Sequence, residues 1–282
     1  MTPMTDLRLI HAPARSGATL MCKAIAVMPT VQLYSEIHPR GPALLATQQE
    51  HPGYMTASLK AQAFTWFGHL QELGADAVFD RHKTENTKAD IDDVMALAQS
   101  QGQVPVMRDW SHMDFFGRPF CEPTGTPALL STLGDHYNLI RTVIVRQPLG
   151  MWLSFQGSGL GQDYAGKEGY DRFLDCYLNF IRCFDGLRVH KYEDFMADQD
   201  QVVRQFCADL HVDYDPTYTE RFRDYKDITG DPAGSGKTSY RDSPRGIAAA
   251  LYQYLITVPS YGVLCDKLGY DPGAVPFGYR VE

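Results

Sequence analysis

Short apolar runs alternate along the chain with longer segments whose apolar residues recur every three or four positions. The short runs predict strands at residues 7–10, 31–34, 104–107, 139–145 and 187–190. The longer segments predict amphipathic helices at residues 19–28, 59–73, 87–100, 126–134, 170–184 and 199–210, with another starting at residues 243–244. Strands separated by helices indicate an α/β fold with a mostly parallel sheet.

Local signals support several of these elements. Thr87 and Asp90 have the spacing of a capping box at the start of a helix. Residues 139–145 are β-branched and apolar on both faces, which is typical of a buried parallel strand. Residues 227–246 are rich in Gly, Asp, Ser and basic residues and indicate a functional loop rather than a linker. We therefore expect one domain over residues 1–282.

The composition is that of a globular protein, because 44% of the 282 residues are hydrophobic and 21% are charged. A net charge of −8 argues against a general nucleic-acid or anionic-membrane binder, so any bound anion needs a local basic pocket. The six Cys form no CxxC pair, which favours buried thiols of a reducing compartment over a zinc site. Asp6 and Arg8 interrupt the N-terminus, which argues against a signal peptide. No apolar run reaches the length of about 18 residues that a membrane-spanning helix needs. We expect a cytoplasmic protein without a membrane span.

The first candidate for chemistry lies where a predicted strand ends and a helix begins. This turn combines small residues with one cation and two hydroxyl groups, in the order Pro13-Ala14-Arg15-Ser16-Gly17-Ala18-Thr19. Backbone N–H groups at such a turn converge on one point, and the helix N-terminus adds the positive end of its dipole. The turn predicts a phosphate site, with a plain turn in which Ser16 caps the helix as the alternative.

A second pattern, at residues 231–238, nearly matches the Walker A motif GxxxxGK[ST]. Asp231 stands where the first glycine belongs, and the preceding residues 221–229 are too polar for a strand. A Walker A site needs a strand, a loop and a helix together. We therefore expect no ATP site here, although Lys237 could meet a phosphate from the loop.

A third candidate lies at the end of the most apolar predicted strand, where Arg146 precedes a turn at Pro148 and a helix that carries Ser154. Ligands of parallel α/β sheets bind outside the carboxyl ends of the strands, which is where Arg146 is expected. An arginine and a hydroxyl group suit a second phosphate. The alternative is a surface ion pair for Arg146 and a hydroxyl of Ser154 bonded to its own helix.

Together these residues resemble the sulfotransferases that use 3′-phosphoadenosine 5′-phosphosulfate (PAPS). Residues 13–19 are similar to the family's 5′-phosphosulfate loop, P-x-[RK]-S-G-[TA]-T. Residues 146–154 are similar to its 3′-phosphate motif, in which Arg and Ser flank a proline turn. Tyr192-Glu193-Asp194 resembles an element whose Tyr lies near the adenine. The motifs occur in the family's order between residues 7 and about 245.

The resemblance implies a three-layer αβα fold of the P-loop-NTPase-like sulfotransferase kind, and a sulfuryl transfer from PAPS to a hydroxyl or amine of a small-molecule or carbohydrate acceptor, without a metal. It assigns PAPS and its product adenosine 3′,5′-bisphosphate (PAP) to Arg15, Ser16, Gly17, Ala18, Thr19, Arg146, Ser154 and Tyr192. Ala18 replaces a commoner Thr. The family's late Arg-Lys-Gly loop is not present as such, and its nearest equivalent adds Gly236 and Lys237 to the cofactor candidates.

The base that takes the acceptor's proton is the least determined residue. Relatives use a His near a strand end or a carboxylate shortly after the phosphate loop, which here points to His112 and Glu36, with Asp109 third. Arg15 would stabilise charge on the bridging oxygen, and Arg108 matches a basic residue of the family. The alternatives are a helix cap or surface charge for Glu36 and a hydrogen-bonded loop residue for His112.

Two other classes of function are weighed against this one. A P-loop kinase would use ATP and Mg²⁺ and would need Thr19 or Thr238 on the magnesium ion, together with a lysine in the phosphate loop. A non-catalytic relative would hold an anion without turnover. The acceptor itself is not identified: Trp66, Trp110 and Trp152 suit stacking on it as well as a core, and residues 40–81 and 157–169 are expected at its mouth.

Overall fold

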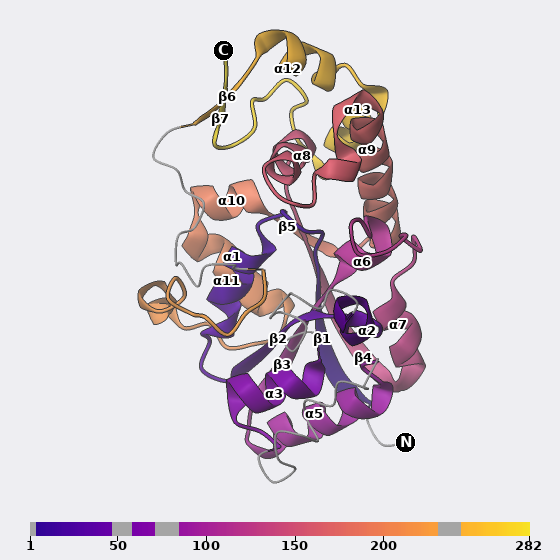
Figure 1. Cartoon of the computed structure of the whole chain (residues 1–282). Coiled ribbons are helices and arrows are strands. Elements are labelled where there is room, and N and C mark those ends of the chain that lie inside the picture. The colour runs from indigo at the N-terminus through magenta and orange to yellow at the C-terminus, as the bar shows by residue number, and fades with distance from the viewer. Residues whose placement is uncertain (1–3, 47–57, 71–84, 231–243) are drawn as a thin grey trace.

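A five-stranded parallel sheet forms the centre of the computed structural model, which describes residues 4–46, 58–70, 85–230 and 244–282 (Figure 1). Its order is β2-β3-β1-β4-β5. The strands are β1 (Thr5–His11), β2 (Val31–Ile37), β3 (Val104–Asp109), β4 (Tyr137–Val145) and β5 (Arg188–Lys191). All four pairings are parallel, so the predicted α/β class and the parallel sheet are confirmed.

Helices cover both faces of this sheet. One face carries α1 (Ala18–Ala26), α10 (Tyr192–Ala197) and α11 (Gln199–Asp209), and the other carries α3 (Leu59–Phe67), α5 (Lys88–Ser100), α7 (Ala128–Leu133) and α9 (Gly166–Cys183). In the central strand, Ile10 packs with α1 and α11, whereas its neighbour Leu9 packs with α3, α5 and α7. Because successive strand residues point to opposite faces, both must be apolar, and the three-layer αβα arrangement follows.

The remaining elements include those that follow the carboxyl ends of β2, β3 and β4, whereas the 3₁₀ turn at Gly134–His136 precedes the amino end of β4. The full set is α2 (Gly41–Ala46), α6 (Ser111–Phe115), α8 (Pro148–Gln156), β6 (Arg245–Ile247), α12 (Ala249–Ile256), α13 (Pro259–Leu268), β7 (Tyr279–Val281) and short 3₁₀ turns at Gly134–His136, Gln162–Tyr164 and Pro216–Glu220. Figure 1 shows α12, β6 and β7 at the opposite end of the molecule from the N-terminus. Ile247, Tyr252 and Tyr261 share one apolar core with residues of β4, α8 and α9.

Two expected helices differ from the structure. The helix expected at residues 59–73 ends at Phe67, because Gly68 adopts a left-handed backbone (φ 66°) and caps it; the last residues of that range lie outside the described part. The expected helix start at residues 243–244 is wrong. Residues 245–247 instead form β6, which pairs with β7, and the helix begins at Ala249. That pairing joins residues far apart in sequence, so no local signal indicates it.

The capping box is confirmed, since Asp90 N donates to Thr87 Oγ1 and the Asp90 carboxylate accepts from Thr87 N at 2.7 Å. None of the helices within the described ranges is both long enough and apolar enough to cross a membrane.

Candidate functional site

The turn between β1 and α1 has the backbone of an anion site. Arg15 and Gly17 both adopt left-handed conformations, with φ of 66° and 88°, and α1 then begins without a side-chain cap. The first N–H groups of the helix are therefore not satisfied by a side chain. Ser16 lies buried inside the turn, and its Oγ has no hydrogen-bond partner among the described residues. These are the groups that an oxyanion would satisfy.

Gly17 is required by packing as well as by its backbone angle. A Cβ at this position would lie 2.2 Å from Cδ2 of Tyr192, the first residue of α10. Burial raises the pKa of Tyr192, so its phenol is neutral near pH 7. Tyr192, which directly follows β5, therefore packs against the turn.

Three arginines from separate elements meet at this turn. Arg15 Nε donates to Ser154 Oγ on α8 at 3.0 Å, and Arg146 Nη1 lies 3.5 Å from the carbonyl oxygen of Arg15. Partial burial of the guanidinium, followed by the positive charges of Arg146 and Arg245, lowers the pKa of Arg15. None of the three has a carboxylate partner within the described ranges. Unpaired like charges repel one another, and a bound anion would remove that repulsion.

Arg146 is held in place by its own backbone and ring contacts. Tyr177 Oη accepts from Arg146 N at 3.1 Å and donates to Arg146 O at 2.8 Å. The guanidinium lies 4.6 Å from the centre of the Tyr192 ring, and its Nε is buried without a hydrogen-bond partner in the described part of the chain. The side chain is therefore aimed before any ligand arrives, which reduces the entropy lost on binding.

Arg245 is a residue of the site that the sequence analysis missed. It begins β6, and a Cβ on Gly157 would lie 3.3 Å from its Nη1, which places the guanidinium at the end of α8. The available signal was the basic, glycine-containing segment of residues 227–246, within which Arg245 was not singled out. The other candidates of that segment, Gly236 and Lys237, lie outside the described residues.

Glu36 lies in a second polar cluster beside the turn. Its backbone is left-handed (φ 56°) at a register shift in β2, and its Oε1 is 3.1 Å from Arg108 Nη2. Arg108 also donates to Thr19 Oγ1 and to Thr229 O, each at 3.0 Å. The Glu36 side chain is 28% exposed, whereas that of Arg108 is 4% exposed. A non-glycine residue in this conformation stores strain, which is common at functional sites.

Asp109 faces inward from the end of β3. Its Oδ2 accepts from His11 Nδ1 and from Ser111 Oγ, both at 2.8 Å, and its side chain has no exposed surface. The His11 ring stacks on Phe184 with ring centres 4.1 Å apart. Asp109 therefore fixes the ends of β1 and β3 against α6 and against Phe184, the residue that follows α9.

His112 also belongs to the interior. It is 1% exposed, its Nε2 donates to the carbonyl oxygen of Arg118 at 2.9 Å, and its ring lies among Phe116, Phe120 and Phe155. Burial lowers the pKa of His112 to about 4. The imidazole is thus neutral near pH 7 and nearly fully buried, and its Nδ1 has no hydrogen-bond partner among the described residues.

Solved structures share this arrangement of elements. A sulfotransferase domain from the Synechococcus PCC 7002 olefin synthase superposes with a TM-score of 0.63 at 17% sequence identity, covering 96% of this chain and 97% of that one. A sulfotransferase domain from the curacin biosynthetic pathway gives 0.51 at 18% identity, covering 96% and 99%. The fold is that of a sulfotransferase domain. No family model and no curated protein matches the sequence.

Within this sulfotransferase fold, one group of the candidate residues comes together and another does not. The residues at or beside the turn are Arg15, Ser16, Gly17, Ala18, Thr19, Glu36, Arg146, Ser154 and Tyr192. Asp109 and His112 are turned away into the core. The described residues contain no group of three or more His, Cys, Asp or Glu side chains arranged to hold a metal ion. The catalytic and binding roles of these residues stay predictions.

Proposed function

We propose that the protein transfers a sulfuryl group from PAPS to a hydroxyl or amine of a small-molecule or carbohydrate acceptor. The observation that carries this proposal is the convergence of three arginines on an uncapped helix start, within a sulfotransferase fold. None of the three has a carboxylate partner in the described part of the chain. PAPS supplies an activated sulfuryl group and carries two separate phosphate centres. A site with cations on two sides of one turn suits a ligand with two separate anionic centres.

The turn and the arginines would bind different parts of PAPS. Arg15 and the N–H groups at the start of α1 would hold the 5′-phosphosulfate, where they also stabilise charge on the bridging oxygen. Arg146 and Ser154 would hold the 3′-phosphate, with Arg245 as a further cation. Tyr192 would border the adenine. The hydroxyl of Ser16 and the Nε of Arg146, both without protein partners in the described part, fit such a ligand.

Glu36 is the base that the geometry favours. It is the one carboxylate of the candidates that has solvent-exposed side-chain surface, and Arg108 connects it to Thr19 at the start of α1. The ion pair with Arg108 fixes the direction of the Glu36 carboxylate, whose oxygens would accept the proton of the acceptor. Arg108 thereby holds the base and the phosphate turn in one fixed arrangement.

The proposal is tested by ligand binding and by transfer. PAP at about 100 times its dissociation constant should raise the free energy of unfolding by roughly 2.7 kcal/mol. ADP, and ATP with magnesium, should stabilise the protein less in the same thermal-shift panel. A preference for ATP with magnesium would support a kinase instead. Binding of PAP without transfer of radiolabelled sulfate to any of a broad set of alcohols, phenols and amines would indicate a non-catalytic relative.

A further inference from the structure

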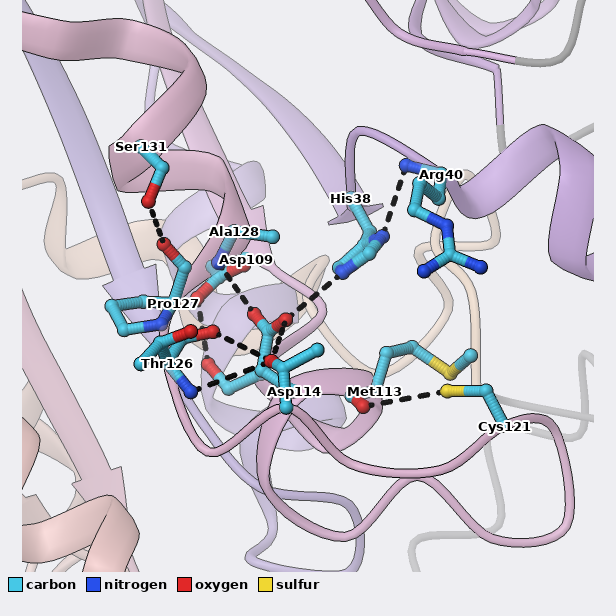
Figure 2. A network of polar contacts seen from close by, with 12 residues as sticks. His38, Arg40, Asp109, Met113, Asp114, Cys121, Thr126, Pro127, Ala128 and Ser131 are labelled. Atoms are coloured by element: carbon cyan, nitrogen blue, oxygen red, sulfur yellow. Dashed lines mark hydrogen bonds and ion pairs between the residues drawn. The ribbon is translucent and has the colours of Figure 1, made fainter.

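The turn that follows β2 is fixed by a buried polar network (Figure 2). His38 Nε2 donates to Asp114 Oδ1 at 3.1 Å, and the other carboxylate oxygen of Asp114 accepts from Ala128 N at 3.0 Å. On its opposite edge the His38 ring accepts from Arg40 N through Nδ1, at 3.1 Å. His38 and Asp114 are 4% and 1% exposed. The backbone that carries Arg40 is therefore anchored to α6 and α7 rather than free to move.

The Arg40 side chain extends from this anchored turn without an ion pair among the described residues. Figure 2 shows its guanidinium directed toward the thioether of Met113 and the thiol of Cys121. Burial raises the pKa of Cys121, and among the nearby charges the positive charge of Arg40 opposes this rise most strongly. An exposed cation on a fixed backbone thus lies over sulfur-containing, apolar side chains.

Those side chains belong to a small apolar cluster separate from the larger cores. Trp110 and Met113 are nearly buried, and Phe120 and Cys121 pack against them while keeping exposed surface. The Trp110 and Phe120 ring centres are 5.4 Å apart. Trp110 N donates to Ile37 O at 3.0 Å, which puts the cluster beside the residue that follows Glu36.

We propose that Arg40 and the exposed surfaces of Phe120 and Cys121, which pack on the nearly buried Trp110 and Met113, form the acceptor site, and that the acceptor carries an anionic oxygen group on an apolar skeleton. The guanidinium would bind the anionic group, and the cluster would bind the skeleton. That the ligand of this site is the acceptor rests on the proposed sulfuryl transfer, because the site adjoins Glu36. The binding site itself does not rest on it. In a chain of net charge −8, an anchored cation that has no carboxylate partner among the described residues is a selective feature for such a ligand.

The test uses two probes with the same aromatic skeleton, the anionic para-hydroxyphenylacetate and its neutral methyl ester, with binding measured by calorimetry in the absence of nucleotide. The unmutated protein should bind the acid about fivefold more tightly than the ester. Arg40→Ala should remove this difference without weakening the ester, and Arg40→Lys should keep part of it. Phe120→Ala should weaken both probes equally. Arg118→Ala is the matched control, since Arg118 is a neighbouring exposed arginine already paired with Glu122.

The outcomes separate this proposal from the proposed reaction. Equal affinities for the two probes, no saturable binding of the acid, or an Arg40→Ala variant that binds both as the unmutated protein does would each overturn the site. Binding of the acid through Arg40 in a protein that does not bind PAP would instead overturn the sulfotransferase proposal and leave the anion site in place. With PAPS present, transfer to the ester as efficient as transfer to the acid would overturn the acceptor assignment alone.

Discussion

Glu36 and His112 lie in two different regions at the carboxyl edge of the sheet. The two regions differ in solvent exposure and in their hydrogen bonds to the phosphate turn. On what we call the open side, comprising the phosphate turn, Glu36, Arg108, Arg146 and Arg245, the carboxylate has exposed surface and is linked through Arg108 to Thr19. On the closed side, comprising His11, Asp109, Ser111 and His112, every side chain is buried and bonded inward.

The difference indicates what each side can do. A base must be able to meet its substrate. The Glu36 side chain has exposed surface, whereas His112 is enclosed by aromatic rings. We infer that the open side performs the chemistry and that the closed side holds the strand ends in register.

The largest expected effect is on kcat, and it should differ between a substitution on the open side and one on the closed side. Glu36→Gln should lower kcat by roughly 10²–10⁴-fold while the affinity for PAP stays unchanged, because only the proton acceptor is lost. His112→Gln keeps a nitrogen donor for the Arg118 carbonyl and should change kcat far less. Sulfate-transfer rates and PAP titrations of both folded variants provide the measurement. A folded His112→Gln protein that binds PAP but no longer turns over, beside an active Glu36→Gln protein, would reverse the comparison.

The closed side should instead affect how the free energy of unfolding changes with pH. His112 has a pKa of about 4 when folded and about 6.5 when unfolded, so below pH 6.5 the unfolded state binds more protons. Its contribution is complete above that pH and decreases as the pH falls toward 4. Between about pH 7.5 and about pH 5 the loss amounts to about 2 kcal/mol.

Urea unfolding at these two pH values measures this loss, and His112→Gln should reduce it. His190 provides a control, since its pKa is also lowered to about 4 by burial and its own contribution should persist in the His112 variant. An unchanged pH dependence in His112→Gln would show that the imidazole is not the buried neutral group described here.

Binding by the open side is tested by Arg146→Ala. The substitution should weaken PAP at least about tenfold, since charge-assisted hydrogen bonds contribute roughly 1.5–3 kcal/mol each, and should barely affect AMP, which lacks the 3′-phosphate. Arg182→Ala removes an exposed charge from α9 and controls for net charge. Equal losses for the two nucleotides would assign Arg146 to the 5′ side or to structure.

The sequence predicted those features whose causes are local. The strand–turn–helix at residues 5–26, the capping box at Thr87 and the arginine at the end of β4 each follow from residues adjacent in the chain. Arg245 was missed because its place beside the turn depends on β6 pairing with β7 and packing near α8.

The candidates for the base could not be ranked from the sequence for a similar reason. Asp109 is held by His11, which lies 98 residues earlier, and His112 is enclosed by side chains that reach it only in the folded chain. Residue type and spacing give a candidate its chemistry. Whether that chemistry faces solvent is decided by tertiary packing.

The smallest expected effect concerns Ser154, which connects α8 to the phosphate turn. Its Oγ accepts from Arg15 Nε at 3.0 Å, so Ser154→Ala leaves the arginine without that partner and less fixed in direction. A hydrogen bond to a charged group contributes roughly 1.5–3 kcal/mol, but the neighbouring Arg146 and Arg245 keep attracting the anion, so we expect PAP to weaken only about fivefold. Thermal stability should stay nearly constant because the methyl group of alanine fits the same space. Ser131→Ala is the matched control, since that hydroxyl lies on the helix α7 and donates to Pro127 O of its own first turn. If Ser154→Ala and Ser131→Ala had the same effect on PAP affinity, the Arg15–Ser154 bond would be structural, and the open side would bind its ligand through charge alone.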